Sequence, residues 1–184
     1  MPAHPTFRPI TPADGEAILR IHRRAILLDA VRAYSPAMVR SWAHGMNADY
    51  AGRAEAAGSV IEVAELHGAV VGFCDVRGDE IQGLFVDPGF TRLGIASGLA
   101  ERTFARMRAA GHDRARVVAA LSGVGFYEAV GFRPVRGVRH ATRGGLVIPV
   151  LEMVRDLDLS PEGEDLGPQA AWAMTRLRPE ALAS

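Results

Sequence analysis

The chain has 184 residues, of which 48% are hydrophobic, and this is enough for one domain with its own core. The basic residues are all arginine and their 21 charges balance 21 acidic ones, so nothing in the net charge points to nucleic acid or to an anionic membrane as a partner. With one cysteine, no apolar signal segment near the N-terminus and no apolar run of membrane-spanning length, we expect a soluble, cytoplasmic protein.

The first predicted elements are a short strand and a helix. Residues 6–10, TFRPI, have strand character. Residues 11–26 read as a helix, because Thr11 stands as an N-cap, Pro12 takes the first helical position and Asp14 follows three residues after the cap. The apolar stripe of this helix consists of Ile18, Ile21 and Ala25.

The next segments are also helical. Ser35 followed by Pro36 repeats the N-cap pattern, which predicts a second short helix. Residues 47–58 have little strand character and are compatible with a helix that continues into a loop.

Three strand-like runs follow in sequence and predict a meander of the sheet. SVIEVAEL and AVVGFCDVR are separated by a turn at His67-Gly68, and EIQGLFVDP follows a turn at Gly78-Asp79. Cys74 lies within the apolar part of the second run, where we expect a buried thiol rather than a nucleophile.

The rest of the chain alternates helices and strands. The pattern predicts a helix over 95–110, a strand over 115–121, a short helix over 124–130, and a strand FRPV before a long last strand over 144–157. We therefore expect one domain over residues 1–157. Residues 158–184 are expected to form a C-terminal extension, either a short helix or partly disordered.

The segment FVDPGFTRLGIASGL, residues 85–99, joins a predicted strand to a predicted helix through a loop with few side chains. The first N–H groups of a helix have no partner in the chain and carry partial positive charge, so small residues there let a phosphate approach the backbone. Gly94, Ala96 and Gly98 are small, and Arg92 adds a full charge. An ordinary strand–helix connection with small residues for close packing explains the local composition about equally well.

Two motifs in this order resemble the GNAT superfamily of acetyl-CoA-dependent N-acetyltransferases. TRLGIA, residues 91–96, is similar to the family's Gln/Arg-x-x-Gly-x-Gly/Ala motif, with Thr91 in place of Gln or Arg. SGVGFYEAVGF, residues 122–132, is similar to the Asn-x-x-x-Phe-Tyr-Glu-x-x-Gly-Phe signature, with Ser122 in place of Asn. The resemblance extends from Phe7 to Leu157. It implies an α/β (α+β) fold in which a mixed, mostly antiparallel sheet with splayed strands is flanked by helices.

The resemblance also implies a site for acetyl-CoA as cosubstrate. Its pyrophosphate would lie on the N–H groups of residues 92–97, its pantetheine arm would pair with the backbone of residues 84–86, and an amide near Val86 would polarise the thioester carbonyl. No metal is expected, because the six histidines have no metal-ligand spacing. The implied cofactor-binding residues are Leu84, Phe85, Val86, Thr91, Arg92, Leu93, Gly94, Ile95, Ala96, Ser97, Ser122 and Phe126.

The implied reaction is direct attack of a primary amine on the thioester, which needs a base for the amine and an acid for the sulfur. By resemblance Tyr127 is the acid; its alternative role is packing. Glu80 shares a strand face with Gln82 and is the candidate base, and a solvated charge beside a turn is an equal alternative. Glu128 is expected to be an exposed helix residue, and Asp87 to cap the following turn.

The acceptor pocket should be bounded by the first two helices and the last hairpin. Tyr34, Trp42, His44 and His140 lie in these segments, although packing is the default role of each. The sequence leaves the acceptor open among a small amine, an amino acid, an aminoglycoside-like compound and a protein N-terminus.

A second hypothesis is an acyl-CoA-binding sensor or structural subunit without turnover, which the departures at Thr91 and Ser122 favour. The presence of Tyr127 favours an enzyme instead. The resemblance also implies a homodimer, with the apolar run GGLVIPVLEMV as one possible interface; a buried final strand explains that run equally well.

Overall fold

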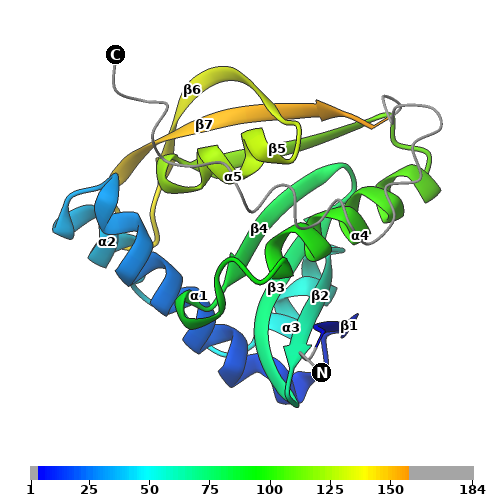
Figure 1. Ribbon diagram of the computed structural model, residues 1–184. Coiled ribbons are helices and arrows are strands. Elements are labelled where there is room, and N and C mark those ends of the chain that lie inside the picture. Colours follow the sequence, from blue (N-terminus) through cyan, green and yellow to red (C-terminus); the bar gives the residue numbers. More distant parts are fainter. Residues whose placement is uncertain (1–3, 158–184) are drawn as a thin grey trace.

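A seven-stranded sheet forms the framework of the protein, with strand order β1-β2-β3-β4-β5-β7-β6 (Figure 1). The structure is a computed structural model that describes residues 4–157. Only the central β4–β5 pair is parallel, so the sheet is mixed and mostly antiparallel, as predicted. The strands are β1 (Thr6–Pro9), β2 (Val60–Leu66), β3 (Ala69–Arg77), β4 (Glu80–Val86), β5 (Arg114–Ala120), β6 (Arg133–Ala141) and β7 (Val147–Asp156).

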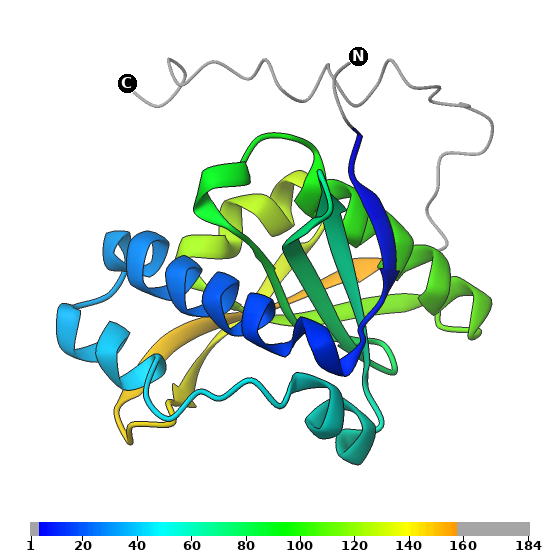
Figure 2. The ribbon, with the colours of Figure 1, turned by 90° about the horizontal axis from the view of Figure 1, so that it is seen from below.

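Helices cover both faces of this sheet (Figure 2). The α-helices are α1 (Gly15–Asp29), α2 (Pro36–Trp42), α3 (Tyr50–Ala57), α4 (Ile95–Ala109) and α5 (Val124–Ala129). Short 3-10 turns lie at Pro12–Asp14, Ala30–Arg32, Pro88–Phe90 and Leu121–Gly123. α1 and α3 pack on one face, and α4 and α5 pack on the other.

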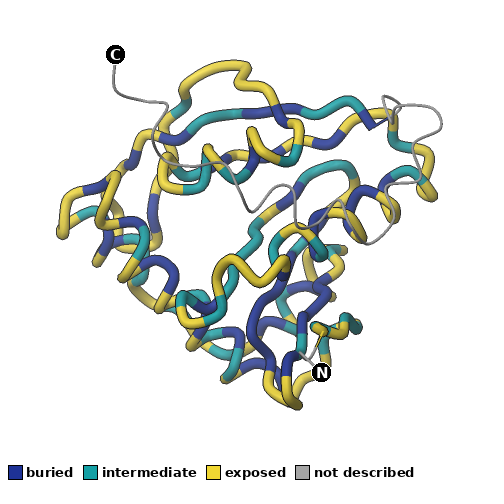
Figure 3. Tube along the Cα trace, viewed as in Figure 1, coloured by how far each residue is buried: buried dark blue, intermediate teal, exposed yellow. Residues whose placement is uncertain are grey.

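Three apolar clusters hold these layers together, one under α4, one under α1 and α3, and one between α2 and β7. The buried positions follow the inner helix stripes and the central strands (Figure 3). The cluster under α4 contains Leu99, Phe104 and Met107, whereas the cluster under α1 contains Ile18 and Ile21. Burying such side chains removes apolar surface from water and is the main favourable contribution to folding.

Cys74 lies within the α4-side cluster, where it is 1% exposed. Burial raises the pKa of its thiol to about 12, so the thiol is uncharged at neutral pH. The expectation that Cys74 is buried is confirmed.

The first helix begins later than the sequence suggested. Pro12–Asp14 form a 3-10 turn, and the α-helix starts at Gly15. A Cβ atom on Gly15 would lie 2.1 Å from the carbonyl oxygen of Ala48. Glycine therefore lets the loop before α3 contact the start of α1, and this contact places α1 and α3 beside each other.

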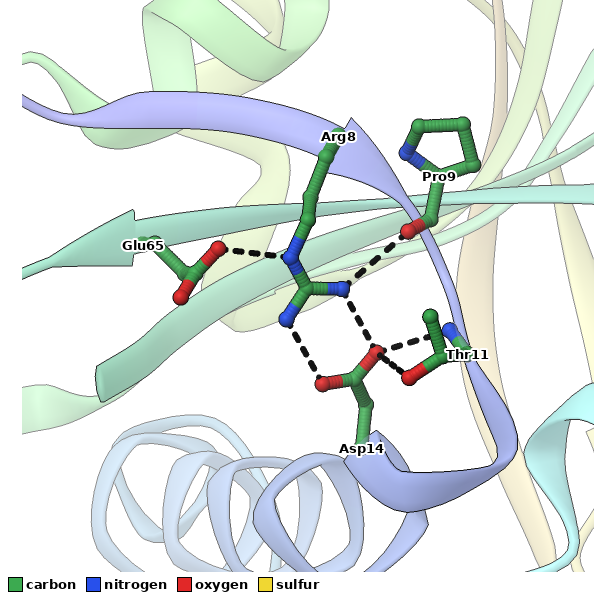
Figure 4. A network of polar contacts seen from close by, with 5 residues as sticks. All are labelled: Arg8, Pro9, Thr11, Asp14 and Glu65. Atoms are coloured by element: carbon green, nitrogen blue, oxygen red, sulfur yellow. Dashed lines mark hydrogen bonds and ion pairs between the residues drawn. The ribbon is translucent and has the colours of Figure 1, made fainter. Parts of the chain in front are cut away.

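The carboxylate of Asp14 faces Arg8 of β1 and also accepts hydrogen bonds from the N–H and the hydroxyl of Thr11 (Figure 4). The guanidinium of Arg8 donates to both carboxylate oxygens of Asp14, at 2.7 and 2.8 Å, and its Nε donates to Glu65 at 2.6 Å. The hydrogen bonds from Arg8 lower the pKa of Asp14 to about 2, despite the opposing effect of burial. This network joins β1, β2 and the start of α1.

Two other predicted elements differ in extent. Residues 50–57 form a separate helix, α3, whose N-cap Asp49 accepts a hydrogen bond from the N–H of Gly52. The predicted strand FRPV is too short, because β6 continues to Ala141 by pairing with β7 along its length. The prediction for residues 158–184 lies outside the described residues. Within residues 4–157, no helix is long and apolar enough to cross a membrane.

Candidate active site

β4 and β5 separate soon after they meet, which opens the middle of the sheet. They pair only through Glu80 and Ile81 of β4. On the β3 side, the register shifts between Ile81 and Gly83, so Gln82 is an extra residue that forms a bulge. A bulge bends its strand and terminates pairing locally, which accounts for the divergence.

The backbone of β4 beyond the bulge has an open side. Asp87 donates its N–H to the carbonyl of Val71 in β3, at 2.8 Å. Because N–H groups alternate in direction along an antiparallel strand, those of Leu84 and Val86 point away from β3, toward the side that β5 has left. These groups are available to a ligand that lies along β4 as an added strand would.

A cavity of about 450 Å³, here the α4 cavity, lies between β4, β5 and the start of α4. Every residue that the resemblance implied for the cofactor lines this cavity except Leu93, whose side chain is 54% exposed. The loop turns the Leu93 side chain to solvent, so any contribution of this residue to the site would come from its backbone N–H. Tyr127 also lines this cavity.

The start of α4 supplies unpaired N–H groups to this cavity. Gly94, the N-cap, and Arg92 both have left-handed backbone, with φ values of 75° and 62°. The first hydrogen bond of the helix runs from the N–H of Gly98 to the carbonyl of Gly94, at 2.8 Å, so the N–H groups at positions 95–97 have no helical partner. With the helix dipole, they form a site for an anionic group.

Gly98 has another role than the one predicted. A Cβ atom there would lie 2.5 Å from Cζ of Phe7 in β1, and Gly98 does not line the α4 cavity. Its missing side chain lets α4 pack closely against β1, so the expectation that it opens space for a phosphate is wrong.

A second cavity of about 500 Å³, here the α1 cavity, lies on the other side of β4, under α1 and α3 and beside the β6–β7 hairpin. Trp42 and His140 line it, as the predicted pocket boundaries suggested. Tyr34 does not: its hydroxyl donates to the carbonyl of Pro149 at 2.7 Å and accepts from the N–H of Leu121 at 2.8 Å. His44 is exposed and lines neither cavity.

The two cavities meet at the divergence of β4 and β5. The residues that line both are Trp42, Gln82, Gly83, Phe85, Val118 and Ala120. A Cβ atom on Gly83 would lie 2.8 Å from Cε2 of Phe85. The absence of a side chain at Gly83 therefore leaves room for the Phe85 ring at this junction. A molecule in one cavity can therefore reach a molecule in the other through the opening in the sheet.

Tyr127 is buried at the inner wall of the α4 cavity. Its ring packs against Phe126 and Phe132, with centroids 5.3 and 5.4 Å away. Within the described residues, its hydroxyl has no hydrogen-bond partner. Burial raises the pKa of the phenol well above its usual value, so the proton remains on the oxygen at neutral pH.

Three predicted carboxylates have different surroundings. Glu80 lines the α1 cavity, two residues before the bulge. Asp87 accepts a hydrogen bond from the N–H of Gly89 at 2.9 Å, which confirms its role in the turn. Glu128 is exposed on α5, also as predicted.

His22 of α1 lines the α1 cavity and was not singled out from the sequence. Its Nδ1 lies 3.0 Å from the hydroxyl of Tyr50, and its ring centroid lies 4.1 Å from that of Phe85. Burial, and then the positive charges of Arg143 and Arg53, lower the pKa of His22 to about 3. The sequence signal that could have identified His22 was its position beside the apolar stripe of Ile18, Ile21 and Ala25 in this helix.

Asp75 of β3 also lines the α1 cavity, and its Oδ1 atom is buried without a hydrogen-bond partner. It pairs across the sheet with Gly83, one of the junction residues. Burial raises the pKa of this carboxyl. A single acid in the apolar run AVVGFCDV was the sequence signal. Within residues 4–157, no group of three or more His, Cys, Asp or Glu residues could hold a metal ion.

Comparisons with known proteins agree on one family. The family model described as "Acetyltransferase (GNAT) domain" matches residues 30–154. YafP of Escherichia coli K12, described as an uncharacterized N-acetyltransferase, is 30% identical over 138 residues, which cover 75% of this chain and 87% of that protein.

Solved structures share the fold. A GCN5-related N-acetyltransferase from Rhodopseudomonas palustris has a TM-score of 0.77 at 23% identity, covering 85% of this chain and 98% of its own. YncA of Salmonella typhimurium, a putative acetyltransferase solved with acetyl-CoA, has a TM-score of 0.64 at 17% identity, covering 88% and 99%.

Proposed function

This chain belongs to the GNAT acetyltransferase family, and we propose that it transfers an acetyl group from acetyl-CoA to a primary amine by direct attack. The observation that carries this proposal is the meeting of two cavities at the divergence of β4 and β5. One cavity has groups suited to an anionic cosubstrate, and the other has ionisable side chains suited to an amine. The reacting atoms would meet at the junction.

Acetyl-CoA, the cosubstrate of GNAT enzymes, supplies an activated acetyl group in its thioester. The residues of the α4 cavity fit it, because the unpaired N–H groups at 95–97 and the side chain of Arg92 suit a pyrophosphate. The open N–H groups of Leu84 and Val86 suit the pantetheine amides and the thioester carbonyl.

The acceptor would enter the α1 cavity. A primary amine is charged at neutral pH and must lose a proton before it attacks. Glu80 lines this cavity next to the bulge, and it is the proposed base, directly or through a water molecule.

The departing sulfur would receive a hydrogen bond from Tyr127. The phenol lines the cosubstrate cavity, and its raised pKa keeps the proton on the oxygen. A donor without another partner within the described residues is free to turn toward the sulfur.

The test is thiol release from acetyl-CoA in the presence of a panel of primary amines. An enzyme releases thiol only when an acceptor is present, and Glu80→Gln should reduce kcat by about 100-fold without changing the affinity for acetyl-CoA. Asp113→Asn is the matched control, because Asp113 is exposed and lines neither cavity. Tight binding of acetyl-CoA without release by any amine would favour the alternative, a non-catalytic acyl-CoA sensor.

A further inference from the structure

The α1 cavity is charged on two sides. Asp75 and Glu80 reach it from β3 and β4, next to the junction with the α4 cavity, and the exposed side chain of Arg77 lies further along β3. Arg53 of α3 and Arg143 of the β6–β7 turn reach it from outside the sheet. A cavity that offers both signs of charge suits a ligand that also carries both.

One oxygen of the Asp75 carboxylate has an unmet hydrogen-bonding capacity, whereas the Ser59 hydroxyl lies within reach of this carboxylate. The Oδ1 atom is buried without a partner, and Asp75 makes no ion pair within the described residues. A buried polar atom that lacks a partner is costly, and a ligand that supplies a donor removes this cost. Because Asp75 pairs with Gly83 at the junction, an ammonium group held by Asp75 would lie close to the point of transfer.

The two arginines form no close ion pair within the described residues, although the charge of Arg53 also acts on Asp75. The guanidinium of Arg53 lies over the Tyr50 ring, 4.6 Å from its centroid, and donates to the neutral side chain of Asn47. Neither Arg53 nor Arg143 forms an ion pair within residues 4–157. Both lower the pKa of His22, so their positive charges act on the same part of the cavity.

Arg143 is held at the cavity by its hairpin. The hydroxyls of Ser41 and Thr142 lie 2.6 Å apart, and the N–H of Gly144 donates to the carbonyl of Ser41 at 2.9 Å. A Cβ atom on Gly144 would lie 2.6 Å from Oγ of Ser41, so the turn lies directly on α2. This attachment fixes the turn that carries Arg143.

Between the charged groups the walls are apolar and largely aromatic. The apolar lining residues include Trp42, Tyr50, Phe73, Phe85, Ile148 and Val150. They suit a hydrocarbon or aromatic body better than a sugar with many hydroxyl groups.

We propose that the acceptor is a zwitterion, an amine that also carries a carboxylate on an apolar body, such as an amino acid. Its ammonium group binds at Asp75 and Glu80, and its carboxylate binds at Arg53 and Arg143. Polycationic acceptors are disfavoured, because the two arginines repel additional positive charge. This assignment rests on the proposed function and narrows its acceptor to one class.

Binding, measured separately from turnover, is the test. Trp42 lines both cavities, and the chain has 2 tryptophans, so replacing Trp172 by Phe leaves Trp42 as the single fluorescent reporter. The CoA-bound protein is titrated with two matched pairs: L-phenylalanine against 2-phenylethylamine, and 6-aminohexanoate against hexylamine. Within each pair only the carboxylate differs.

In at least one pair, the zwitterion should bind at least about tenfold more tightly than the amine, as expected for a charge-assisted contact. Arg143→Gln should remove that preference and leave the affinity for the amine unchanged or higher. Arg139→Gln, on the exposed strand β6 and outside both cavities, should change neither affinity. Asp75→Asn should weaken binding of both members of a pair.

The inference is overturned if the amines bind as tightly as the zwitterions in both pairs, if neither zwitterion binds at millimolar concentration, or if Arg143→Gln leaves the preference intact. The proposed function fails separately, when no amine of either kind promotes thiol release from acetyl-CoA. Release with amines that lack a carboxylate, at equal kcat/KM, would sustain the function and overturn the zwitterion.

Discussion

His22 of α1 lies against Phe85 of β4, with the two ring centroids 4.1 Å apart, at the junction of the two cavities. The contact connects the first helix to the strand whose bulge opens the sheet. Because partial burial disfavours the charged imidazole and the positive charges of Arg143 and Arg53 add to this effect, the pKa of His22 is lowered and the ring is neutral at physiological pH.

Protein stability should therefore fall as the pH falls below 6.5. The pKa of His22 is 6.5 in the unfolded chain and about 3 in the folded one, so between these values the unfolded state binds more protons. Between pH 6.5 and pH 5 the expected loss from this residue is about 2 kcal/mol.

Urea unfolding at pH 7.5 and pH 5 measures this loss, and His22→Gln should reduce the difference between the two pH values. His67→Gln is the control, because His67 lies in an exposed hairpin turn. An equal pH dependence in wild type and His22→Gln would contradict the assignment.

Tyr127→Phe should lower kcat by about 100-fold and leave the affinity for acetyl-CoA unchanged, because only the proton donor is removed. Steady-state thiol release and calorimetry together measure both quantities. Tyr34→Phe provides the contrast: it removes hydrogen bonds to Pro149 and Leu121, so it should reduce stability and leave kcat intact. Undiminished turnover by Tyr127→Phe would assign Tyr127 to packing alone.

Ser41→Ala should loosen the β6–β7 hairpin. It removes the contact with Thr142 at 2.6 Å and the hydrogen bond from the N–H of Leu146 at 3.1 Å, at an expected cost of about 1 to 2 kcal/mol. Since this hairpin carries Arg143, the KM for the acceptor should rise while the affinity for acetyl-CoA stays constant.

Ser35→Ala is the matched variant in α2. It removes the N-cap of that helix and should cost about 1 kcal/mol of stability without changing the KM for the acceptor. A similar rise of KM in both variants would show that general destabilisation, and not the hairpin, is responsible.

Local signals in the sequence predicted the sheet meander and the loop before α4, since those residues are neighbours along the chain. The residues of the α4 cavity were implied by the resemblance to the GNAT family, because they come from several distant segments. The α1 cavity was harder to predict. Arg53 and Arg143 come together only through the fold, and neither stands in a motif.

Packing contacts between residues far apart in the chain were equally difficult to predict from the sequence. Gly98 lies beside the loop motif, but its missing side chain makes room for Phe7 in β1. The length of β6 depends on pairing with β7, which FRPV alone does not encode. Asp75 was not predicted to matter, because only the folded structure reveals that its Oδ1 atom is buried without a hydrogen-bond partner.

The central claim is that the α4 cavity holds acetyl-CoA, and calorimetric titration of acetyl-CoA into wild type and Ala96→Phe tests it most directly. Ala96 lines the cavity in the first turn of α4, so a phenyl ring there should block the cosubstrate. The account predicts micromolar binding to wild type and at least about a 100-fold loss in a folded Ala96→Phe variant. No binding to wild type, or equal binding to both, would contradict it.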